Sequence, residues 1–235
     1  MQSNKTEKAK ESLDKLFHFP DIIIKKAKEY SEKSSFPESE KEIPYYYFIV
    51  KNFIAAHEAR FGTIPVQVHN EHRMTLDHLI RAKASNYDGH TNNAIGHLRR
   101  ALLDIAKLNC AGLRKEIDKR QAAIPKKALG LISNGDYIKG YIKMQNEAEN
   151  LLNEARSEDH KIGSIVEINE NIVNLFVKAY VAHCDWYKFQ SENMGNALLI
   201  KTKYYFITGF PLIISFLLGL GVNFIYDYLK HIVGN

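Results

Sequence analysis

The chain has 235 residues, 45% of them apolar and 25% charged, which is the composition of a globular protein with one sizeable core or two small ones. Its two cysteines, Cys110 and Cys184, lie far apart and neither belongs to a CxxC pair, which argues against a zinc site and a disulfide framework and favours a reducing compartment. The net charge of +5 is compatible with anionic lipid or RNA as a partner, but it indicates neither.

The N-terminal segment, residues 1–44, is polar and rich in lysine, and it lacks the apolar stretch of a cleaved signal peptide. Short apolar groups around Leu13 and Ile23 predict one or two amphipathic helices here, which we expect to form a segment of their own. The PESEKEIP stretch, residues 37–44, predicts a loop.

Residues 45–200 predict a single helical domain. Apolar residues at helical spacing run from Tyr46 to about Phe61, and the sequence FGTIP ends this helix. A helix of about 15 residues is expected from Asn70, followed by a turn around NYDGHTNN and by a long helix that carries Ile95 to Leu108.

A further segment begins at Pro125, and the Asn134-Gly135 pair predicts a break before a helix over residues 136–157. No strand-like alternation extends beyond a few residues, so the predicted fold class is all-α.

The stretch from Ile165 to Phe189 has apolar residues that alternate by three and four, as in a heptad repeat. Two interpretations remain open at this point. The repeat is either one core stripe of a bundle within the chain or the contact face of an intermolecular coiled coil. Its members are Ile165, Ile168, Ile172, Leu175, Ala179, Ala182, Trp186 and Phe189.

Residues 201–235 contain the longest apolar run. Tyr204 to Tyr226 is 23 residues without a charge, about 34 Å of helix, which matches a hydrocarbon core of about 30 Å. Aromatic residues stand at both ends, and Lys201 and Lys203 precede the run. We therefore predict one C-terminal transmembrane helix with the N-terminal domain in the cytosol, the alternative being a buried core helix.

Three small or polar residues follow each other at intervals of four within this run: Ser215, Gly219 and Asn223. Such a stripe favours close packing between helices in lipid. It predicts assembly into a homo-oligomer and makes these residues candidates for a pore lining, whereas in a plain anchor they would face lipid.

The candidate chemistry lies in NEHRMTLDHLIRA, where Arg73 and His78 form an R-x4-H motif. A histidine moves protons near neutral pH, and an arginine stabilises charge on a phosphate. The five-residue step places the two side chains about 140° apart around a helix. The alternative role for the arginine is a surface ion pair with Asp77, four residues away.

Two other groups of basic side chains are weaker candidates. His97, Arg99 and Arg100 form either a basic patch or, as we prefer, a solvated helix face with one packed histidine. His69 and His72 have the spacing of a metal-ligand pair but no evident third ligand, so neither a metal nor another cofactor is expected.

The R-x4-H motif and the helix HTNNAIGHLRRALLDIAKL that follows it resemble the HEPN superfamily over roughly residues 45–120. The resemblance implies a helical bundle in which two protomers pair their motifs as one metal-independent RNase site, with His78 as the proton-moving group and Arg73 as the phosphate-binding group. Met74 stands where the family commonly has a polar residue, so we expect a degenerate motif without enzymatic activity.

A HEPN-like helical domain combined with one membrane helix is most similar to the small membrane accessory protein of type VI-B CRISPR systems. That resemblance implies an antiviral effector that forms a ring in the bacterial inner membrane and permeabilises it once an RNA-guided RNase (of the Cas13b type) has been triggered. Two alternatives remain: a membrane-tethered RNase that uses Arg73 and His78, and an inactive tethering adaptor.

Overall fold

The computed structural model describes residues 19–85, 88–130, 132–162, 168–194 and 197–233. Within these ranges every regular element is a helix, so the all-α prediction is confirmed. The elements in chain order are α2 (Phe19–Lys33), η1 (Glu38–Glu40), α3 (Glu42–Phe61), α4 (Val66–Ser85), α5 (Asp88–Ala122), α6 (Lys126–Leu129), η2 (Ile132–Gly135), α7 (Asp136–Asp159), α8 (Glu170–Met194) and α9 (Ala197–Val233).

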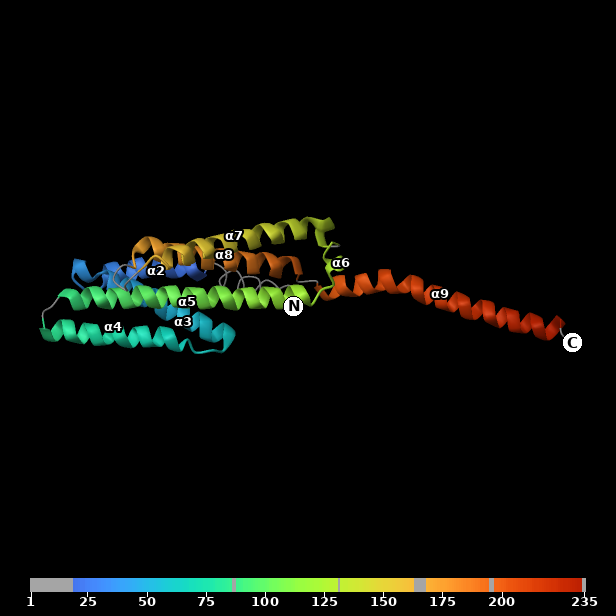
Figure 1. The fold of residues 1–235 in the computed structure, drawn as a ribbon, viewed down its shortest axis with the longest axis horizontal. Helices are drawn as coiled ribbons and strands as arrows, with labels where there is room; N and C mark the ends of the chain where they lie inside the picture. The colour runs from blue at the N-terminus through green and yellow to red at the C-terminus, as the bar shows by residue number, and fades with distance from the viewer. Residues whose placement is uncertain (1–18, 86–87, 131, 163–167, 195–196, 234–235) are drawn as a thin grey trace, which may run out of the picture.

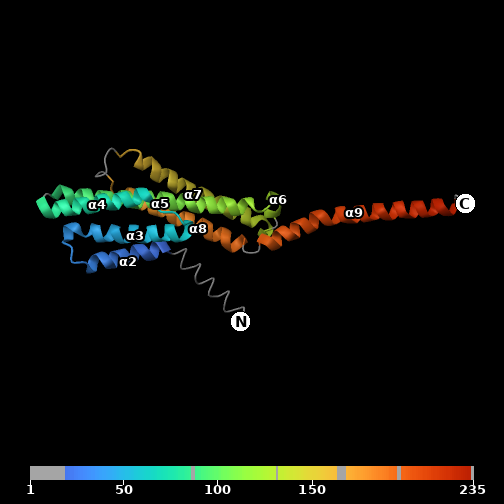
Figure 2. The same ribbon diagram turned by 90° about the horizontal axis from the view of Figure 1, so that it is seen from below.

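The long helix α5 forms the middle of a helical bundle. It packs against α3, α4 and α8, while α7 packs on α8 and α2 packs on α3. Figures 1 and 2 show the bundle elongated along α5, with α9 leaving its end as a single extended helix. The bundle and the apolar helix are therefore arranged end to end.

The start of α3 differs from the predicted loop over residues 37–44. The helix begins at Glu42, and Pro44 lies inside its first turn, where a proline is tolerated because the missing N–H would have no helical partner. Gly62 ends the helix in the left-handed conformation, with φ 65° and its N–H bonded to the Glu58 carbonyl at 2.9 Å.

Helices α4 and α5 are both longer than the sequence indicated. Helix α4 begins at Val66, directly after Pro65 and ahead of the expected start at Asn70. Helix α5 begins at Asp88, so most of the predicted turn NYDGHTNN is helical. The result is a long antiparallel contact between the two helices that includes the polar start of α5.

The heptad repeat lies inside the chain's own core. Ile168, Ala179 and Trp186 are 0% exposed, and Ile172 is 6% exposed. Ile165 lies outside the described residues. The described members thus support the interpretation as an intramolecular core stripe, and the intermolecular coiled coil is wrong because the bundle already covers its contact face.

A smaller apolar cluster joins the bundle to α9. Gly135, with φ 91°, ends η2 at the predicted break, and α7 follows as expected. The cluster includes Ile124, Leu129 and Tyr137, and the first turns of α9 pack on it through Ile200 and Tyr204. The root of α9 is therefore attached to the bundle before the exposed part begins.

Helix α2 belongs to the same core as the main bundle. Ile23 and Ala27 are buried together with residues of α3, α5 and α8. The predicted helix around Leu13 falls in residues 1–18, outside the described residues.

Candidate functional site

Four polar side chains face each other between α4 and α5. Glu71 and His78 on α4 are seven residues apart, and so are His90 and His97 on α5. Seven residues turn a helix by about 700°, so each pair lies on one face. The long contact between the helices brings the two faces together.

Short contacts connect these side chains. His97 Nδ1 lies 2.7 Å from Glu71 Oε2, and His78 Nδ1 lies 3.2 Å from His90 Nδ1. The rings of His78 and His97 stack, with centroids 5.2 Å apart. We call Glu71, His78, His90 and His97 the histidine cluster; it is a chain of proton donors and acceptors in which one ring of the His78–His90 pair must donate and the other accept.

The environment of His78 disfavours its protonated form. Partial burial lowers the pKa of His78, and the neighbouring imidazoles of His97 and His90 lower it further. A neutral His78 is suited to accept a proton, which is the role of a general base.

Arg73 does not join this cluster. It is exposed on the opposite side of α4, as the step of about 140° from His78 requires. Among the described residues it has no ion-pair or hydrogen-bond partner, and Asp77 pairs instead with Arg81 at 2.9 Å. The predicted Arg73–Asp77 pair is therefore wrong, and a single chain does not bring Arg73 and His78 together.

The basic patch at His97, Arg99 and Arg100 is wrong. Of the preferred interpretation, the packed histidine is confirmed by His97, which contacts Glu71, but the two arginines do not form a solvated face. Arg99 bonds to Glu42 at 2.6 Å and to the Ile168 carbonyl at 2.8 Å, which ties α5 to two other segments. Arg100 bonds to Asp159 of α7 at 3.1 Å. These cations are used in contacts between helices and are not displayed for an external phosphate.

His69 and His72 lie near each other on α4, with ring centroids 6.5 Å apart. Burial lowers the pKa of His72, with a smaller contribution from His69. Over the described ranges, no group of three or more histidine, cysteine or acidic side chains is placed to hold a metal ion.

The sequence reasoning missed Glu71 and His90. The predicted turn NYDGHTNN includes His90, and the contact of His90 with His78 depends on the helical start of α5 at Asp88. The sequence signal for this cluster is the seven-residue spacing of polar residues on both helices. Residues at that spacing share one face of a helix, and the polar faces of two neighbouring helices can meet.

Helix α9 carries a segment, Leu199–Leu220, that is long and apolar enough to cross a membrane. None of its described residues is fully buried, and only its start, at Ile200 and Tyr204, packs on the small apolar cluster. It is consequently not a core helix of this fold. The Ser215 hydroxyl donates to the Pro211 carbonyl at 2.8 Å, and a methyl group at Gly219 would meet nothing within 4 Å. The side chain of Asn223 lies outside the described residues. The described part of the predicted stripe is thus Ser215 and Gly219, and both are exposed.

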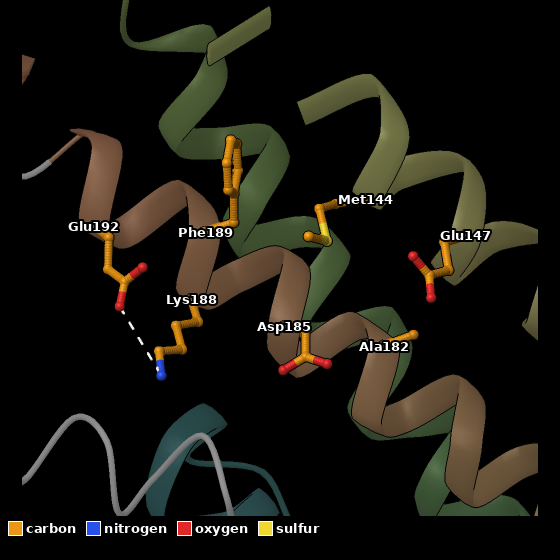
Figure 3. Close-up of a pocket in the computed structure, with 7 residues that line it drawn as sticks. All are labelled: Met144, Glu147, Ala182, Asp185, Lys188, Phe189 and Glu192. Carbon is orange, nitrogen blue, oxygen red and sulfur yellow. Dashed lines mark ion pairs between the residues drawn. The ribbon is translucent and has the colours of Figure 1, made fainter. Parts of the chain in front are cut away.

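A groove between α7 and α8 has acidic walls. Figure 3 shows Glu147, Asp185 and Glu192 around it, with Lys188 Nζ 4.0 Å from Glu192 Oε1. Carboxylates repel phosphate groups, so this groove is unsuited to RNA.

No protein-family model, curated protein or solved structure matches this chain.

Three histidines, the buried His183 and the partly buried His72 and His78, predict a stability that falls in mild acid. Burial is the main cause that lowers the pKa of His72, His78 and His183. In the unfolded chain the histidine pKa is near 6.5, so the unfolded chain binds protons more readily than the folded one. The contribution of these histidines to the free energy of unfolding is therefore fully present above about pH 6.5 and decreases as the pH falls below it. We expect a lower thermal unfolding midpoint at pH 5.5 than at pH 7.5 in the same detergent, and a smaller difference in His183→Gln. An unfolding midpoint that is equal or higher at pH 5.5 would contradict this.

Proposed function

We propose that this protein is an oligomeric, membrane-anchored antiviral defence effector that forms a pore or perturbs the bacterial inner membrane and thereby enhances an RNA-guided RNase. The observation that carries the proposal is the exposed apolar segment Leu199–Leu220, which projects from the end of a helical bundle. Exposing so much apolar surface to water is unfavourable, and a bilayer removes that cost.

The proposal assigns assembly to α9 and the role of a scaffold to the bundle. The heptad repeat is buried in the chain's own core and is not available for contacts between chains. Ser215 and Gly219 are then the described residues suited to helix association in lipid. In this arrangement the helical bundle, of the HEPN type, stays in the cytosol and α9 crosses the membrane once.

Replacement of Gly219 by isoleucine tests the assembly. The added side chain prevents close approach of neighbouring helices, so we expect the particle mass in detergent, measured by light scattering, to fall toward that of a monomer. The matched control is Gly221→Ile, because Gly221 lies two residues, about 200°, further around the same helix and should leave the mass unchanged. A wild-type protein that is strictly monomeric in detergent and in lipid nanodiscs would contradict the proposal.

The same variants test the membrane effect. Cells that express the protein together with its triggered RNase should depolarise, and Gly219→Ile should depolarise them less than Gly221→Ile. Equal depolarisation by the two variants would mean that the Ser215–Gly219 stripe is not responsible for the membrane effect.

The second candidate function is a membrane-tethered, metal-independent RNase. Arg73 shares the outer face of α4 with two exposed apolar residues, Leu76 and Ile80, which are 58% and 61% exposed. A composite site would need the arginine of a second copy of the chain to reach His78, which lies on the other side of α4 and faces α5. The separation of Arg73 and His78 within one chain supports the scaffold role over this second candidate.

RNA cleavage in the presence of a chelator distinguishes these functions. For the scaffold we expect no cleavage by wild type above the level of Arg73→Ala or His78→Ala. An RNase would cleave in a way that both substitutions abolish, while Arg81→Ala, a substitution on the same helix, leaves cleavage intact.

The third candidate, an inactive adaptor, predicts capture of a cytosolic partner that is independent of oligomer state.

A further inference from the structure

A cavity lies between α3, α5 and α8, apart from the histidine cluster and from α9. Its volume is about 440 Å³, within the range of small-molecule sites. Phe61, Leu113 and Tyr180 provide apolar walls, and Asn109 and two arginines are the polar groups considered below.

Asn109 is a buried side chain with an unused donor. It is 1% exposed, and its Oδ1 lies 2.9 Å from His57 Nδ1. His57 Nε2 in turn lies 2.9 Å from the Thr63 hydroxyl. With His57 donating from Nδ1, the Asn109 oxygen is the acceptor, and its Nδ2 has no hydrogen-bond partner among the described residues. A buried donor without a partner is unfavourable, and a ligand acceptor in the cavity would satisfy it.

Two arginines are held in place on the same aromatic ring. The guanidinium carbons of Arg60 and Arg120 lie 4.1 and 4.2 Å from the centroid of the Tyr187 ring. Arg60 also bonds to Glu116 at 3.0 Å, and Arg120 bonds to Ser191 at 2.7 Å and to the Tyr187 hydroxyl. Stacking and hydrogen bonds fix the orientation of both side chains in advance.

The charge of the cavity favours an anion. The lining carries two guanidinium groups and one carboxylate, that of Glu116, so its net charge is positive. Each guanidinium has N–H groups beyond those used in the contacts above, and such groups bind phosphate oxygens well. The apolar walls in turn favour a ligand whose remaining part is not charged.

We propose that this cavity binds a small phosphate monoester whose remaining part, the body, is uncharged. The phosphate contacts Arg60 and Arg120, the body packs against Phe61 and Leu113, and an acceptor on the body bonds to Asn109 Nδ2. A soluble nucleotide and a lipid headgroup both offer this chemistry. The site is independent of the pore and of the R-x4-H motif, so its test does not depend on the proposed function.

The test uses the full-length protein in a neutral detergent and isothermal titration calorimetry. Adenosine monophosphate is titrated beside adenosine, and dihexanoyl phosphatidic acid beside dihexanoylglycerol. Saturable binding of a phosphate probe without binding of its phosphate-free counterpart supports the proposal, and the probe that binds identifies a soluble or a lipid source. If neither phosphate probe binds at millimolar concentration, the proposal is wrong.

Variants locate the binding. Asn109→Asp keeps an acceptor for His57 and replaces the amide donor by a carboxylate that repels the ligand, so we expect binding at least about tenfold weaker. Arg120→Gln should have a similar effect. Arg114→Gln is the matched control, because Arg114 is on the same helix and pairs with Glu149 at 3.2 Å, and it does not line the cavity. Equal binding by all three variants would overturn the assignment of this site.

Discussion

Replacing Leu217 by arginine is expected to release the protein from membranes. Leu217 is 58% exposed and lies near the centre of the predicted span from Tyr204 to Tyr226. An arginine at the centre of a membrane helix costs roughly 3 kcal/mol on insertion scales, and the favourable transfer of the leucine is lost as well. The measurement is the fraction of protein that remains with the membrane after alkaline carbonate extraction.

The control for this experiment is Leu199→Arg. Leu199 is 68% exposed, somewhat more than Leu217, but it lies two residues from Lys201, at the end where an arginine can extend toward the headgroups. We expect Leu199→Arg to remain membrane-bound. If Leu217→Arg is retained as well as this control, α9 does not cross the bilayer in the proposed register.

Replacing Trp186 by alanine is expected to destabilise the bundle by about 3–5 kcal/mol, because a large aromatic side chain leaves a cavity in a packed core. Trp186 is 0% exposed, and its ring meets Tyr141 of α7 edge to face at a centroid distance of 5.5 Å. The substitution therefore weakens the contact between α8 and α7. The free energy of unfolding is measured by denaturant titration in detergent.

Circular dichroism is the signal for this measurement, since Trp186 is the only tryptophan and its fluorescence is lost in the variant. Leu76→Ala serves as the control. Leu76 is 58% exposed on the outer face of α4, and its truncation should change the stability by less than about 0.5 kcal/mol. Equal losses in the two variants would mean that α8 is not packed as described.

The two experiments probe separate parts of the chain. Trp186 belongs to the bundle, whereas Leu217 belongs to the exposed part of α9. We expect Trp186→Ala to unfold more readily but to stay in the membrane, and Leu217→Arg to leave the membrane with its bundle intact. These two results together would establish that the anchor and the bundle act independently. The link between them is the small apolar cluster around Leu129 and Tyr204.

The all-α fold and the apolar C-terminal helix were determined by the sequence alone. Both depend on local properties. The spacing of apolar residues determines the apolar face of each helix, and an uncharged run of 23 residues forms a helix long enough to span a bilayer whatever segments lie nearby. Glycine marked the ends of helical elements for the same reason, at Gly62 and Gly135.

The candidate sites were decided by the tertiary structure, because they depend on which faces of different helices meet. The R-x4-H spacing correctly implied that Arg73 and His78 point apart, but only the packing of α4 on α5 brought His78 to His90 and His97. The heptad repeat had two interpretations until burial assigned Trp186 to the chain's own core. Arg60 and Arg120 are 60 residues apart in sequence, and only the contact of three helices places both on the Tyr187 ring beside Asn109.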